Sequence, residues 1–261
     1  QGDAWDTVMN YDAFMEPVSY FVTGMEKHSD AYEPGAQGDS ERFENAMRYY
    51  MTKFTGSSLY TAMNQLSNHD HSRFLTRTNH KVGRASALGV AAASEDINIP
   101  LYKVAVLMQM TWPGAPTLYY GDEAGMEGFE DPFNRRTFPW GREDSELMGW
   151  FSRLGHMRKQ SPALRQGDIH YRVGKGPVLA FTRTQGEETI LAAFNTGSEE
   201  ATLRLREELA KNVTDAALVV VAQRIATIMH ADQIIVLDDG HVVGTGTHEA
   251  VSYTHLTLPT T

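Results

Sequence analysis

Residues 66–75 read LSNHDHSRFL and place Asn68, His69 and Asp70 directly after a run rich in Tyr, Thr and apolar residues. That run, residues 59–66, predicts a short buried strand. An acid and an imidazole just beyond the C-terminal end of a buried strand are typical of the rim of an α/β barrel, where sites form. The alternative is a loop in which Asp70 caps a following helix and His69 is an ordinary surface histidine.

The composition of the 261-residue chain limits the classes of function. Its 41% hydrophobic and 21% charged residues are typical of a globular protein with a core, in one large domain or two smaller ones. The net charge of -10 is unlike that of a nucleic-acid binder, and no stretch is long and apolar enough for membrane insertion. The absence of Cys fits the cytoplasmic location that we expect, as it also fits many secreted bacterial proteins.

The first 162 residues alternate between short β-prone runs and amphipathic segments, which predicts an α/β arrangement. After Pro162 the pattern changes to alternating β-type runs separated by turns that contain Gly, which predicts a small antiparallel sheet. The β-prone runs of the first part are residues 6–11, 59–66 and 117–120, its helical patterns span residues 40–54 and 145–160 and begin at Pro100, and the later β-type runs are residues 169–173, 178–184, 189–195 and 201–205.

Four segments together carry a family resemblance: GDAWDTVMNY, LSNHDHSRFL, PGAPTLYYGDEAGM and DPFNRRTFPW, which begin at Gly2, Leu66, Pro113 and Asp131. In this order and spacing they resemble the C-terminal part of the alpha-amylase family of glycoside hydrolases, most closely the neopullulanase, cyclomaltodextrinase and maltogenic amylase branch. The resemblance implies the sixth to eighth strands of a (β/α)8 TIM barrel in residues 1–162. It also implies the family's C-terminal β-domain in residues 163–208.

The resemblance also implies roles for single residues in a retaining glycosidase, which acts through two carboxyl groups and an oxocarbenium-like transition state. Asp70 would be a third acid, which stabilises the positive charge, and His69 and Asn68 would bind the same sugar. Asp131 and Arg135 match the DPxxR positions that hold the neighbouring sugar of an α-glucan oligosaccharide. Their alternative is a surface salt bridge.

The nucleophile and the acid/base of this family lie on the fourth and fifth barrel strands, upstream of Gln1. Because the chain starts with Gln and not Met, we expect it to begin inside a longer protein. Loss of the nucleophile alone is usually enough to abolish the reaction, so the chain by itself is expected to be inactive. No metal site and no cofactor is predicted within this chain. The resemblance leaves open the preferred glucan, hydrolysis or transglycosylation, calcium dependence and whether the parent enzyme is a homo-oligomer.

Residues 209–250 have a different pattern, with a buried strand at 217–222 and a hairpin formed by 233–237 and 242–244 through an Asp-Gly turn. This segment resembles the C-terminal end of the nucleotide-binding domain of an ABC exporter, which predicts a short α/β fragment. Gln223 would stand where that family usually has a histidine that contacts the γ-phosphate. ATPase activity is not expected, because the segment has no P-loop pattern.

Residues 251–261 (VSYTHLTLPTT) fit neither family and resemble translated adaptor sequence appended to a read. The alternative is a natural polar tail. Three interpretations of the whole chain remain: a glycoside hydrolase fragment, an ABC exporter ATPase fragment, and an artificial chimera with no function as a whole.

Overall fold

The computed structural model describes residues 7–198, 234–238 and 241–246. The chain divides into two compact units, Gln1–Ala217 and Leu218–Thr261. The predicted strand at 201–205, Gln223 and the tail at 251–261 lie outside the described residues. Among the described residues, no helix combines the length and the apolar character that crossing a bilayer requires.

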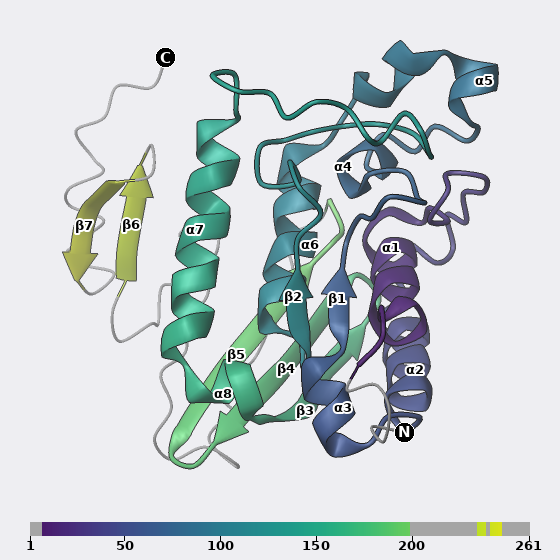
Figure 1. Cartoon of the computed structure of the whole chain (residues 1–261). Coiled ribbons are helices and arrows are strands. Elements are labelled where there is room, and N and C mark those ends of the chain that lie inside the picture. Colours follow the sequence, from purple (N-terminus) through teal and green to yellow (C-terminus); the bar gives the residue numbers. More distant parts are fainter. Residues whose placement is uncertain (1–6, 199–233, 239–240, 247–261) are drawn as a thin grey trace. The chain divides into compact units, whose positions relative to one another are not determined.

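Three parallel segments lie side by side in the first unit. Strand β1 (Met63–Gln65) pairs in parallel with β2 (Ala115–Thr117), with Met63 opposite Ala115. On the other edge of β1, Met9 forms an isolated parallel bridge with Met63. This order, with helices between the segments, is the arrangement of consecutive strands in an α/β barrel (Figure 1).

Helices connect the three parallel segments, and several begin at residues whose side chains cap them. The side chains of Asp39, Asn98 and Asp144 accept hydrogen bonds from backbone N–H groups in the first turns of α2, α6 and α7. Figure 1 shows α1 and α2 on one side of β1 and β2, and α6 and α7 on the other. The helices are η1 (Tyr11–Met15, a π-helix), α1 (Glu16–Thr23), α2 (Ser40–Met51), α3 (Gly56–Thr61), α4 (Phe74–Arg77), α5 (Ala85–Leu88), η2 (Val90–Ser94, a 3-10 helix), α6 (Ile99–Thr111), α7 (Ser145–Gln160) and α8 (Pro162–Gln166).

The parallel strands are shorter than the sequence predicts. The prediction of a strand over 59–66 is wrong in its first half, because Thr55 caps α3: its hydroxyl accepts a hydrogen bond from the Ser58 N–H. The predicted strand over 6–11 is reduced to the bridge at Met9, because the Asn10 side chain accepts the Ala13 N–H and turns the chain into η1. The predicted run at 117–120 contributes only its first residue to β2.

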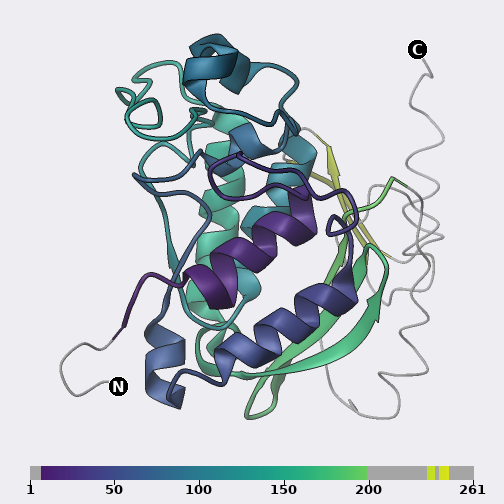
Figure 2. The ribbon, with the colours of Figure 1, turned by 90° about the vertical axis from the view of Figure 1, so that its right-hand side faces the viewer.

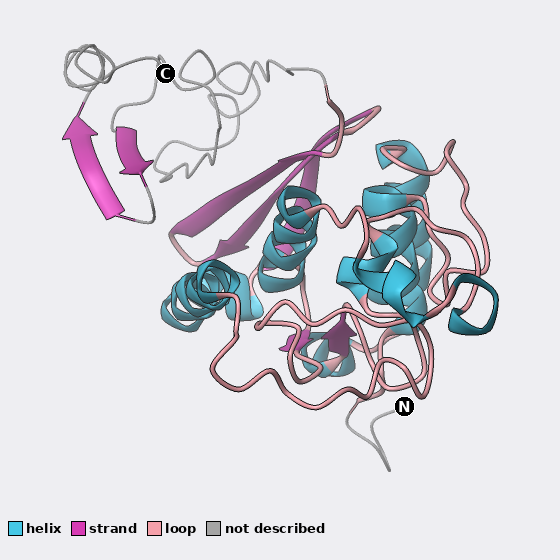
Figure 3. Ribbon diagram, turned by 90° about the horizontal axis from the view of Figure 1, so that it is seen from above, coloured by secondary structure: helices cyan, strands magenta, loops and turns pink. Residues whose placement is uncertain are grey.

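An antiparallel sheet follows α8, as the sequence predicts. It consists of β3 (Asp168–Lys175), β4 (Val178–Gln185) and β5 (Glu188–Asn195), in the order β3–β4–β5. The strands are joined by tight turns in which Gly176 and Gly186 have positive φ angles of 56° and 60°. Seen from above, the sheet runs along one flank of the helices (Figure 3).

The helices and this sheet share one hydrophobic core. Trp112, at the end of α6, is fully buried and packs edge-to-face on Phe181 of β4, with ring centroids 5.1 Å apart. Its other edge-to-face partner is Phe43 of α2, at 5.5 Å. Helix α2 lies next to β3 (Figure 2). The sheet therefore packs directly on the helical part within the first unit.

The described part of the second unit is a hairpin of β6 (Ile234–Asp238) and β7 (His241–Gly246). The two strands pair antiparallel, with Ile234 opposite Gly246. This confirms the hairpin that the sequence predicts, with bounds that differ by one to two residues.

Candidate functional site

The predicted site lies in the turn that follows β1. Asn68 is buried, and its Oδ1 accepts hydrogen bonds from the backbone N–H groups of Asp70 (2.9 Å) and His71 (3.2 Å). Asn side chains commonly hold turns in this way. Because all of these bonds are internal, they favour a role for Asn68 in shaping the turn over direct contact with a sugar.

The turn leaves His69 and Asp70 open to solvent. Their side chains are 47% and 52% exposed, and Nε2 of His69 lies 3.3 Å from Oδ1 of Asp70. The alternative in which Asp70 caps the next helix is wrong. Helix α4 begins at Phe74, and the Phe74 N–H donates to the hydroxyl of Ser67 instead. The imidazole and the carboxylate are therefore free to meet a ligand together.

Two aromatic side chains support the turn from behind. The Asn68 Nδ2 donates to the Tyr11 hydroxyl (3.0 Å), and the Tyr11 ring packs edge-to-face on His71, with centroids 5.2 Å apart. Burial raises the pKa of Tyr11, and the negative charge of Asp70 raises it further, so the phenol is neutral. Burial lowers the pKa of His71 to about 3, so this imidazole is neutral as well.

Asp131 and Arg135 form a two-pronged ion pair at the same end of the strands. Arg135 Nε donates to one carboxylate oxygen of Asp131 (2.6 Å) and its terminal nitrogen to the other (3.2 Å), and both side chains are exposed. The pKa of Arg135 is raised chiefly by its hydrogen bond to Asp131, and Asp70 adds a smaller contribution of the same sign. The guanidinium thus lies within electrostatic reach of Asp70.

Two buried residues that the sequence analysis did not single out connect these groups. Asn134 Nδ2 donates to the backbone carbonyls of Asn68 (3.1 Å) and His71 (2.7 Å). Arg73 Nε donates to the backbone carbonyl of Asn134 (3.0 Å), and Arg73 Nη1 forms an ion pair with Asp122 (3.0 Å). Both residues lie inside the segments that carried the family resemblance, which was the only signal for them in the sequence.

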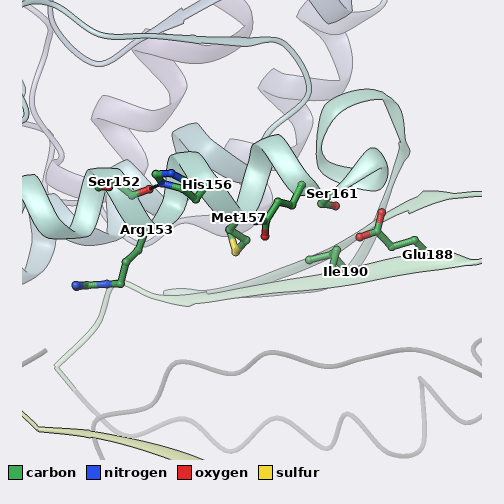
Figure 4. Close-up of a pocket in the computed structure, with 8 residues that line it drawn as sticks. Ser152, Arg153, His156, Met157, Ser161, Glu188 and Ile190 are labelled. Carbon is green, nitrogen blue, oxygen red and sulfur yellow. Dashed lines mark hydrogen bonds between the residues drawn. The ribbon is translucent and has the colours of Figure 1, made fainter. Parts of the chain in front are cut away.

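A groove elsewhere in the first unit shares none of these residues. It lies between α7 and β5, has a volume of about 520 Å³, and is lined by side chains that include Arg153, His156 and Glu188 (Figure 4). One carboxylate oxygen of Glu188 accepts a hydrogen bond from the Ala163 N–H (2.8 Å). Glu188 therefore has a structural contact at the start of α8. No group of three or more His, Cys, Asp or Glu side chains within the described residues could hold a metal ion.

Comparisons with known proteins agree on one family. A model described as the catalytic domain of alpha amylase matches residues 1–151. An amylopullulanase of Thermoanaerobacter thermohydrosulfuricus is 34% identical over 182 residues, which cover 70% of this chain and 12% of that protein. A cyclomaltodextrinase of Geobacillus thermopakistaniensis is 28% identical over 205 residues, which cover 77% of this chain and 30% of that protein.

The crystal structure of a debranching enzyme from Nostoc punctiforme is similar to this chain with a TM-score of 0.64 and 29% identity, over 76% of this chain and 38% of that one. The chain therefore spans well under two thirds of the length of each of these relatives. The matching catalytic-domain model covers more than half of the chain, in the region that holds the parallel strands and the predicted site. This chain belongs to the alpha-amylase family.

Proposed function

We propose that this chain carries the sugar-binding part of a retaining glycosidase site that acts on α-glucans. The observation that carries the proposal is the exposed pair of His69 and Asp70 at the C-terminal end of β1. The names of two relatives, an amylopullulanase and a cyclomaltodextrinase, support α-glucans as the class of substrate.

In this proposal Asp70 is the acid that stabilises the transition state. A retaining glycosidase builds positive charge on the sugar ring as the glycosidic bond breaks. A fixed carboxylate near the ring stabilises that charge. His69 donates a hydrogen bond to the same sugar, and Asp131 and Arg135 bind the neighbouring sugar on its non-reducing side.

We expect no hydrolysis by this chain alone. The reaction needs a nucleophilic carboxylate and an acid/base carboxyl roughly 5 Å apart. Two of the acids near the site are engaged with cations: Asp122 is buried against Arg73, and Asp131 is paired with Arg135. Asp70 thus acts in binding, and α-glucan hydrolysis is proposed for the parent protein, with the nucleophile and acid/base outside these 261 residues.

A binding measurement tests the proposal. Titration calorimetry of maltohexaose into the whole chain is expected to show weak binding that Asp70→Ala, His69→Ala and Asp131→Asn each reduce. The matched control is Asp30→Asn, because Asp30 also pairs with an exposed arginine, Arg84 (2.8 Å), outside the site. Binding that none of the three site variants alters contradicts the proposal.

An activity measurement tests the expected lack of hydrolysis. A reducing-sugar assay with pullulan and with cyclodextrin should give the same signal for the purified chain as for buffer. Turnover above the buffer value that Asp70→Ala abolishes would show that the chain contains its own nucleophile and acid/base.

For residues 209–250 we infer an origin in an ABC exporter nucleotide-binding domain, with Gln223 near the γ-phosphate position, and for residues 251–261 an appended tail. The described part of this segment is the β6–β7 hairpin, which supplies the two antiparallel strands of the proposed fragment. Amplification across codons 200–215 from source DNA tests the chimera, since a single natural product would show a true fusion. Binding of ATP by the chain would favour the transporter origin.

A further inference from the structure

We propose that Asn134 is a positioning residue that holds the turn with His69 and Asp70 and the segment with Asp131 and Arg135 in one fixed relation, so that both contact the same α-glucan chain. This inference rests on the proposed function, because it concerns how the same site is held in shape. It assigns a role in that site to a buried side chain that does not itself contact the sugar.

The two hydrogen bonds of Asn134 enclose the exposed pair. Its Nδ2 donates to the backbone carbonyls of Asn68 and His71, the residues that immediately precede and follow His69 and Asp70. Asn134 is fully buried, so water does not compete for these bonds. Both ends of the turn are therefore attached to one amide group, and a shift of that group moves the whole turn.

The same residue is part of the second binding segment. Arg135 follows it directly in the chain, and the Asn134 carbonyl accepts a hydrogen bond from Arg73 Nε (3.0 Å). Arg73 is itself fixed by its ion pair with Asp122 and by the ring of Tyr119, 4.5 Å from its guanidinium carbon. The main chain beside Arg135 is therefore held by a hydrogen bond from a buried guanidinium that is itself fixed.

The chemistry of the amide explains why Asn stands at this position. Both neighbours are carbonyl oxygens, so the NH2 group must face them, and a carboxylate of the same shape has no hydrogen to donate. Oδ1 of Asn134 is buried without a hydrogen-bond partner among the described residues. Burying this unpaired acceptor costs free energy that an apolar side chain would not cost. The amide's favourable contribution is therefore its two donated hydrogen bonds.

Gln109 provides a matched control within the same unit. It is also a buried amide, its Nε2 donates to the carbonyls of Asn64 (2.9 Å) and Thr117 (3.1 Å), and its Oε1 has no partner among the described residues. It connects β1 with the end of β2, whereas Asn134 connects the turns beyond the strands. Replacement of either amide by Ala removes two buried hydrogen bonds.

The first experiment compares Asn134→Ala with Gln109→Ala by titration calorimetry with maltohexaose, after melting temperatures have been measured. Both variants should melt earlier, but only Asn134→Ala should weaken binding, by about tenfold, which is within the usual range of coupling between neighbouring groups. Asn134→Ser, which keeps one donor, should recover part of the affinity. Unchanged affinity in Asn134→Ala, or an equal loss in both Ala variants, overturns the proposal.

A second measurement does not depend on sugar binding. The N–H groups of Asp70 and His71 should exchange with deuterium about tenfold faster in Asn134→Ala than in the unmodified chain, while those of α6 stay protected. If the unmodified chain binds no maltohexaose, the proposed function fails and this exchange still decides the positioning role of Asn134. Unchanged exchange at Asp70 and His71 overturns it.

Discussion

The guanidinium of Arg73 forms an ion pair with the carboxylate of Asp122 at 3.0 Å, and the two side chains are 0% and 4% exposed. The pair joins the turn after β1 to the turn after β2, 49 residues along the chain. Asp122 therefore has a structural role beneath the candidate site. It is not one of the residues to which the sequence assigned a binding role.

Asp122→Ala should strongly destabilise the fold, because it leaves the Arg73 guanidinium buried without its partner. Such a loss typically costs about 3–5 kcal/mol. The double variant Arg73→Met/Asp122→Leu should recover most of it, since both charges of the pair are then removed together. Urea unfolding of the single and double variants measures both values. The control is Asp30→Ala in the exposed pair with Arg84, where about 1 kcal/mol or less is expected; equal losses at the two pairs would contradict the prediction.

The stability of the fold should also depend on pH through Asp122. Burial raises the pKa of Asp122 to about 6 although Arg73 opposes this, whereas an unfolded Asp titrates near 3.9. Between these values the folded state holds a proton that the unfolded state has lost, so the contribution of Asp122 to stability falls as the pH rises. Relative to Asp122→Asn, the free energy of unfolding should fall by roughly 2 kcal/mol from pH 4 to pH 7. A difference that stays constant over this range would exclude the shift.

His71 should act with the opposite sign. Burial lowers its pKa to about 3, below the value near 6.5 of an unfolded histidine. Between these values the unfolded state binds a proton that the folded state does not, so stability is lost as the pH falls below about 6.5. His71→Phe keeps a ring against Tyr11 and removes this titration. Its unfolding free energy, measured in urea from pH 7 to pH 4, should fall less than that of the unmodified chain.

Local patterns predicted the elements whose signals lie within a few residues. The helix over 145–160 has the bounds of α7, because Asp144 caps its start and its apolar residues keep helical spacing. The first three β-type runs after Pro162 became β3, β4 and β5. The strand over 59–66 failed in its first half because Thr55, just before the run, caps a helix that extends into it as far as Thr61. At this position the helix cap decides the local structure, although the composition of the run favours a strand. The periodicity of the sequence does not reveal such a cap.

The exposed residues of the candidate site were named from the sequence, and the buried residues that support them were not. His69 and Asp70 stand in a short segment that the resemblance covers. Asn134 reaches His71 across 63 residues of chain, and no local pattern indicates that contact. The contact between Asn134 and His71 depends on how β1 and β2 pair. That pairing is known only from the folded structure.

The helices and the β3–β5 sheet should unfold together. Phe181 of β4 is fully buried and packs on Trp112, the residue that directly follows α6. Phe181→Ala should lower the free energy of unfolding by about 3–5 kcal/mol, since it removes a ring from a core that both parts share. Thermal melts followed by far-UV and near-UV circular dichroism should show one transition for the first unit, at a lower temperature than in the unmodified chain.

The control for this prediction is Trp140→Ala, because Trp140 is an aromatic side chain that is 77% exposed. Removal of an exposed ring away from the core should change stability by about 0.5 kcal/mol or less. A sheet that folded as an independent domain over residues 163–208 would give a second, separate transition, and Phe181→Ala would shift only that one. The contact between Phe181 and Trp112 predicts instead that both spectroscopic signals shift by the same amount.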